Sequence, residues 1–109
     1  MERFRKYFDK VVNIKNVKDS NQLMVFGVFC KTFSEPLEDF DEIEFNTEFN
    51  NQNVLISIVV VLNEIKRIQF TLIDPENPDI VRGLTESQLK DFLVQKGDQI
   101  VKFFEYITQ

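Results

Sequence analysis

The stretch "LISIVVVLNEIKRIQF", Leu55 to Phe70, contains most of the longest apolar run in the chain. Between Val54 and Leu62 only Ser57 interrupts the apolar residues, and a short polar break follows. Valine and isoleucine dominate this run, which is typical of a β-strand. A strand in a small domain usually has one apolar and one polar face. Here both faces are apolar, and the sequence raises the question of what covers the second one.

The preceding segment "FDEIEFNTEF", residues 40–49, alternates between apolar and polar side chains. This period of two predicts a half-buried strand. The polar residues "NNQN" that follow predict a four-residue turn, which would place Phe45 opposite Ile58 and Phe49 opposite Val54. The two segments are therefore expected to form an antiparallel hairpin.

A second hairpin is predicted where the long apolar run ends. A short turn at Glu64–Lys66 would place Phe70 beside Val60 on a third strand. One register then makes the three strands agree on a single buried face. The predicted core face consists of Ile43, Phe45, Phe49, Val54, Ile56, Ile58, Val60, Leu62, Ile68, Phe70 and Leu72.

The N-terminal segment "MERFRKYFDKVVNIKNVKDS" has the apolar spacing of a helix. Phe4, Tyr7, Val11 and Ile14 also fit the a and d positions of a heptad seam. Residues 1–18 are therefore expected to pack on the sheet of the same chain or to form the end of a coiled coil.

The remaining segments are less regular. "NQLMVFGVFCKTF" is predicted to be extended, and "SEPLEDF" and "DPENPD" are predicted loops because proline and serine mark them. Thr85 and Gln88 form a predicted capping box at the start of a helix. Gly97 is predicted to stop that helix and Asp98 to begin another. The buried stripe of the last helix would contain Ile100, Phe103, Phe104 and Ile107.

These elements predict one α+β domain over residues 1–109. Its N-terminal helix, four-stranded antiparallel sheet and C-terminal helices would form two layers, with the helices packed on one face. Leu55, Val59 and Val61 would then point outward, among Glu42, Glu44 and Glu48. These apolar residues are either scattered surface residues or a surface that another chain covers.

The composition argues against catalysis. The chain has no histidine, a single cysteine, Cys30, and three glycines that lie far apart. It therefore has no Cys–His pair, no phosphate-binding glycine loop and no ligand set for a metal, and we expect no cofactor. The acidic stretch "EPLEDFDEIE" lacks the spacing of a calcium loop and is interpreted as a solvated face.

Charge and hydropathy limit the class of partner. The net charge of −5 argues against nucleic acid as the main ligand. No apolar run is long enough to span a membrane, and no secretory signal is recognised, so we expect an intracellular protein. Residues 1–31 contain seven basic and three acidic side chains, whereas residues 32–65 contain eight acidic and no basic ones. This asymmetry either steers a partner or only keeps the surface solvated.

The segments "LISIVVVLNE", "RIQFTLID" and "IVRGLTESQLKDFLVQKGDQIVKFFEYI" resemble the RWD-like head domains of kinetochore proteins over about residues 40–108. The similar heads are those of monopolin and of the paired inner-end subunits of the four-protein complex that couples kinetochores to microtubules. Phe103 and Phe104 match the aromatic positions of the closing helix of these heads. The long coiled coil that precedes such heads has no counterpart beyond residues 4–14.

The resemblance implies a non-enzymatic protein-binding function at the centromere, in chromosome segregation during cell division, and a nuclear location. Such heads dimerise and bind a peptide segment of a linker protein, so a homodimer or heterodimer is expected. The candidate partner-binding residues are Phe4, Tyr7, Val11, Ile14, Leu55, Val59 and Val61. The alternative is a small acidic chaperone-like dimer that binds an extended segment of a partner protein; an enzyme that depends on a cofactor or on a partner's residues is the weakest option.

Overall fold

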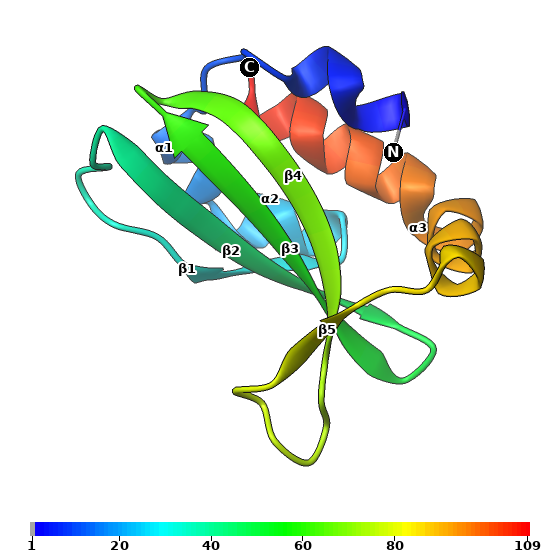
Figure 1. Cartoon of the computed structure of the whole chain (residues 1–109). Coiled ribbons are helices and arrows are strands. Elements are labelled where there is room, and N and C mark those ends of the chain that lie inside the picture. The colour runs from blue at the N-terminus through cyan, green and yellow to red at the C-terminus, as the bar shows by residue number, and fades with distance from the viewer. Residues whose placement is uncertain (1) are drawn as a thin grey trace.

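The computed structural model describes residues 2–109 as an α+β domain with helices on one face of a five-stranded antiparallel sheet (Figure 1). The strands are adjacent in chain order: β1 (Val28–Thr32), β2 (Phe40–Phe49), β3 (Gln52–Val61), β4 (Glu64–Ile73) and β5 (Val81–Gly83). The helical elements are the 3-10 helix η1 (Glu2–Tyr7) and the α-helices α1 (Ile14–Val17), α2 (Ser20–Val25) and α3 (Glu86–Ile107). The sequence predicted four strands, and β5 is the additional one.

Both central hairpins close through two-residue turns. Asn50 and Asn51 join β2 to β3 with φ angles of 51° and 61°. Leu62 and Asn63 join β3 to β4 with φ angles of 51° and 69°. Two successive positive φ angles are typical of the type I′ turn, whose twist matches that of the paired strands. Asparagine tolerates this left-handed region well, whereas leucine is unusual there.

The tighter turns change the predicted register but not the predicted face. Phe45 is paired with Ile56 rather than Ile58, a shift of two residues. Phe70 is also paired with Ile56 rather than with Val60, a shift of four residues. Since side chains alternate with a period of two, an even shift keeps every side chain on its predicted face.

The predicted core face is wrong at one position. Leu62 lies in the turn and is 67% exposed. Ile65 is fully buried in its place and is paired with Val60, because a β-bulge between Val59 and Val60 shifts the register of β4. A bulge adds one residue to one strand and so brings the next side chain back to the required face.

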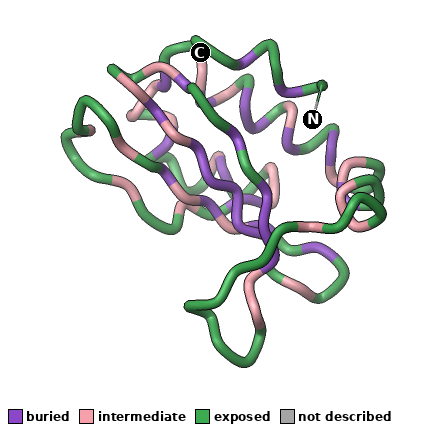
Figure 2. Tube along the Cα trace, in the orientation of Figure 1, coloured by how far each residue is buried: buried purple, intermediate pink, exposed green. Residues whose placement is uncertain are grey.

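Helix α3 covers the inner face of the sheet with aromatic side chains. The ring of Phe103 lies 4.8 Å from that of Phe45, and Phe92 lies 5.4 Å from Phe49 and 5.3 Å from Phe70, as centroid distances. The predicted stripe is buried throughout, at Ile100, Phe103, Phe104 and Ile107. Figure 2 shows the buried residues gathered along β2, β3, β4 and the sheet-facing side of α3. The predicted capping box at Thr85 and Gln88 is present.

The predicted break at Gly97 is wrong, because α3 continues through this residue to Ile107. Gly97 is buried under the guanidinium group of Arg3, which donates to the carbonyl oxygen of Leu93 and pairs with Asp98 at 2.5 Å. A Cβ atom at position 97 would overlap the end of the Arg3 side chain. The glycine therefore makes room for the N-terminal segment rather than ending the helix.

Gly97→Ala is expected to raise the free energy of unfolding by up to about 1 kcal/mol, because alanine is the better helix former. The clash involves only the end of a flexible side chain, and the exposed Arg3–Asp98 pair that it displaces contributes little. Urea unfolding of Gly97→Ala and of Arg3→Ala with Gly97→Ala checks this. A loss of stability in both variants would contradict the explanation.

The predicted N-terminal helix is replaced by η1 and α1, which an extended segment separates. Phe4 and Tyr7 belong to η1 and pack on Phe104, at centroid distances of 5.4 Å each. The chain then turns at Asp9, whose φ is 68°, and follows β4, with an isolated bridge between Val11 and Glu64. No continuous helix spans residues 2–18, and Met1 lies outside the described residues.

The segment that is predicted to be extended, residues 21–33, begins inside helix α2. The side chain of Asp19 caps this helix by accepting a hydrogen bond of 3.1 Å from the amide of Gln22. Gly27, with φ of 70°, separates α2 from β1. Asp19 followed by Ser20 is therefore the local signal for the start of this helix.

Candidate protein-interaction surfaces

The described residues 2–109 contain no group of three or more histidine, cysteine, aspartate or glutamate side chains that could hold a metal ion. Within the same residues no helix is both long and apolar enough to cross a membrane. Cys30 is half-buried, and burial raises the pKa of its thiol, which keeps the sulfur in its less reactive protonated form.

The predicted heptad seam does not form a surface. Phe4 and Tyr7 are buried against α3, and Ile14 is partly buried against the same core. The hydroxyl of Tyr7 donates to the carbonyl oxygen of Val101 at 3.3 Å and to Glu105 at 3.4 Å. Val11 is the exception, because 58% of it is exposed. Three of the four seam residues therefore stabilise their own domain rather than face a partner.

Val11 joins the other predicted surface instead. It is paired with Glu64, Glu64 with Val61, and Val61 with Phe40, so these four residues form one row across the sheet. Directly paired residues of antiparallel strands point to the same face, which here is the face opposite α3. Phe40 was not predicted as a site residue, although it is 68% exposed.

Val59 lies next to this row on the same face. It is half-buried between Glu42 of β2 and Arg67 of β4. We call Val11, Phe40, Val59 and Val61 the outer-face patch. The row crosses three gaps between adjacent strands, each about 4.8 Å, so the patch is roughly 14 Å wide.

Leu55 is placed differently from the two valines. Only 6% of it is exposed, since Asn46 and Thr71 flank it on the neighbouring strands. Asn46 Oδ1 and Thr71 Oγ1 are buried without a protein hydrogen-bond partner. The residues of the chain itself therefore cover this part of the second face of the sheet.

Charged groups of both signs surround the outer-face patch. Glu42 accepts a 2.6 Å hydrogen bond from Ser57, which fixes its carboxylate on the outer face. Lys66 donates to Asp9 at 2.5 Å and to Glu64 at 3.2 Å, and these hydrogen bonds raise the pKa of Lys66. On β2 these groups are acidic, whereas β4 carries both signs, with Glu64, Lys66 and Arg67.

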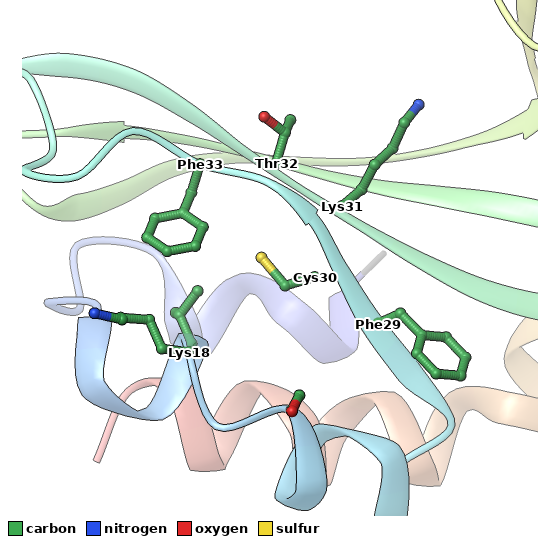
Figure 3. A pocket seen from close by; sticks show the side chains of 8 residues that line it. Lys18, Phe29, Cys30, Lys31, Thr32 and Phe33 are labelled. Atoms are coloured by element: carbon green, nitrogen blue, oxygen red, sulfur yellow. The ribbon is translucent and has the colours of Figure 1, made fainter.

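A second candidate surface lies along β1, the strand at one edge of the sheet. Figure 3 shows a hollow between this strand and the helices below it. Its volume is about 500 Å³. We call this hollow the β1 groove; its lining residues are Val17, Lys18, Ser20, Phe29, Cys30, Lys31, Thr32 and Phe33. The groove is not predictable from the sequence, because it depends on how α1 and α2 lie beside the edge strand.

Compared with known protein families, with curated proteins and with solved structures, the chain matches none of them.

Proposed function

We propose that the chain is a non-enzymatic protein-interaction module, an RWD-like head of a kinetochore subunit that pairs with another subunit through the outer-face patch. The observation that carries the proposal is the row formed by Phe40, Val61, Glu64 and Val11. The row joins Val11, near the N-terminus, to residues of β2, β3 and β4 on the face of the sheet opposite α3. The sequence resemblance over residues 40–108 supplies the kinetochore assignment.

The energetics of the patch suit a specific contact. Complete burial of a valine or phenylalanine side chain contributes roughly 1.5–3 kcal/mol, so a few anchors are enough. Glu42, Glu44 and Glu48 lie in turn along the outer face of β2. They favour a partner with basic groups over this strand and disfavour a copy whose β2 faces it directly.

The N-terminal segment distinguishes this domain from heads that follow a coiled coil. Residues 2–13 turn back onto α3 and β4, through the Phe4–Phe104 contact and the hydrogen bond from Asn13 to Ile107. We therefore assign pairing to the sheet face and not to a helical stalk.

The test is affinity capture with the double variant Phe40→Lys, Val61→Lys. The wild-type protein is expected to retain kinetochore subunits, and the double variant is expected to lose them while its circular dichroism spectrum stays unchanged. Light scattering of the purified protein separates a heterodimer from a homodimer.

A matched control is the double variant Val25→Lys, Val94→Lys, whose two valines are exposed, at 67% and 78%, and lie on α2 and α3. It should retain the same proteins as the wild type. Equal recovery by the patch variant would rule out the outer-face patch, and the absence of any kinetochore subunit from the wild-type sample would refute the kinetochore assignment.

A further inference from the structure

We propose that the open edge of β1 binds an extended, acidic segment of a partner protein, which adds to the sheet as a sixth strand and fills the β1 groove with its apolar side chains. This inference concerns a surface on the sheet edge, and it does not depend on the outer-face patch.

The hydrogen-bonding groups of β1 are satisfied on one side only. β1 is paired with β2 and occupies the end of the strand order, and within residues 2–109 its backbone makes no other strand pairing. Edge strands of this kind are usually protected by several charges, by proline or by a covering element. The segment "VFCKT" contains one charge, Lys31, and its Phe29 is 55% exposed.

The groove runs along this edge, between β1 and the helical segment of residues 17–20. Its lining includes five consecutive residues, from Phe29 to Phe33. Consecutive side chains of a strand point to opposite faces, so a single hollow can touch all five only at the strand's edge. Figure 3 shows Cys30 and Phe33 directed toward the helices and Lys31 and Thr32 directed away from them.

The groove has a second wall, and its length suits an extended peptide segment. Val17, Lys18 and Ser20 line the side opposite β1. The five residues of β1 extend over roughly 17 Å, about the length of five residues of an added strand. Main-chain hydrogen bonds would then supply affinity, and alternate side chains of the segment would enter the hollow beside Cys30 and Phe33.

The charge of the lining favours an acidic segment. Its two ionisable cationic side chains are Lys18 and Lys31, and no acidic residue lines the groove. Lys18 is paired with Glu35 at 2.5 Å in an exposed contact, which an incoming carboxylate can replace. Lys31 forms no ion pair within the part of the chain that the structure describes.

A β-bulge places Lys31 at this edge. Cys30 is paired with Phe45 and Thr32 with Glu44, so Lys31 is the extra residue. Bulges redirect side chains and commonly occur at sheet edges. The opposite edge strand, β5, has only three residues, and the hollow beside it is about 200 Å³. The longer edge with the larger hollow is therefore the better site for strand addition.

The experiment measures fluorescence anisotropy of a labelled peptide, acetyl-EVDVEVD-amide, against the full chain at low and high salt. We expect saturable binding that weakens with salt and drops roughly tenfold or more in Lys31→Glu, because the substitution puts like charges together. Lys102→Glu, an equal change of charge at an exposed position on α3, should bind like the wild type.

Two further peptides test strand addition itself. One carries backbone N-methyl groups on its odd residues and the other on its even residues. Each peptide has therefore lost the amide donors along one edge of its extended backbone, while its charge is unchanged. One of them should fail to bind and the other should bind like the parent peptide. Equal binding by both would overturn the strand-addition proposal, as would stronger binding of the basic peptide acetyl-KVKVKVK-amide.

Cys30 reports the location of the peptide. Bound peptide should slow alkylation of the thiol by N-ethylmaleimide about fivefold or more, since the thiol lines the groove. Unchanged alkylation at saturating peptide would place the binding elsewhere and overturn the proposal. The Phe40→Lys, Val61→Lys variant should bind the peptide normally, which separates this inference from the proposed function.

Light scattering decides between a peptide segment and a second copy of the chain. A monomer that binds the peptide supports the proposal. A dimer that the peptide does not dissociate, and whose Cys30 resists alkylation without peptide, would show that a second copy occupies the edge and would overturn the proposal.

Discussion

Phe103→Ala is expected to lower the free energy of unfolding by about 3–5 kcal/mol, and Phe104→Ala by a similar amount. Both rings are completely buried. Phe103 packs edge-on against Phe45 of β2, and the Phe103 and Phe104 rings lie 5.1 Å apart. Each substitution therefore removes aromatic contacts and leaves a cavity between α3 and the sheet. Urea unfolding, followed by circular dichroism, gives the change.

The matched control for these substitutions is Val94→Ala, on the same helix. Val94 is 78% exposed, so its replacement should change the stability by no more than about 0.5 kcal/mol. A midpoint that is unchanged in both phenylalanine variants would show that α3 does not close the sheet in solution.

The second large effect is expected at Phe4. Phe4→Ala should lower the free energy of unfolding by about 3–5 kcal/mol, because the ring is completely buried between Phe70 of β4 and Phe104 of α3. The distances between ring centroids are 5.5 Å and 5.4 Å. This result would show that Phe4 belongs to the core of the domain. A residue of a free helical stalk would not contribute to the stability of the domain in this way.

Phe8→Ala is the control for the N-terminal segment. Phe8 is four residues further along and is exposed, so its loss should have a small effect. Equal, small effects of Phe4→Ala and Phe8→Ala would contradict the packing of η1 on α3. Light scattering of Phe4→Ala should also show no change of oligomeric state, since Phe4 faces its own chain.

The alternation of apolar and polar residues was enough to predict the faces of the central strands. Phe45, Ile56 and Phe70 all point inward as expected. Their register was not predictable from alternation, because a shift of two or four residues leaves every side chain on the same face of the sheet. The turn chemistry contained the missing information: Asn50 and Asn51 suit a two-residue turn, but the polar Gln52 and Asn53 resembled further turn residues.

The N-terminal prediction failed for a different reason. Phe4 and Tyr7 have helical spacing, and a 3-10 turn satisfies that spacing over so short a distance. The positive φ of Asp9 then ends the helical course, and pairing with β4 takes over. Tertiary contact therefore overrode local propensity. Gly97 looks like a helix stop from its neighbours alone, because the approach of Arg3 from the other end of the sequence has no local signal.

The candidate surfaces were predictable to a smaller extent. Val59 and Val61 could be assigned to the outer face from the strand pattern alone. The meeting of Val11 with Val61 required knowledge of the bridge to Glu64, which joins residues more than fifty positions apart. The β1 groove depends on α1, α2 and the edge strand together, and so no single stretch of the sequence indicated it.

The contact between η1 and α3 has a consequence for synthesis of the chain. Ribosomes add about 5–20 residues per second, so this chain takes on the order of ten seconds to make. The inner face of β2, β3 and β4 is complete at residue 73, but Phe103 and Phe104 follow some thirty residues later and α3 ends only at Ile107. Phe4 has no helix to pack on before then. For a few seconds the nascent chain therefore exposes an apolar sheet, and this interval is when it most needs protection from aggregation.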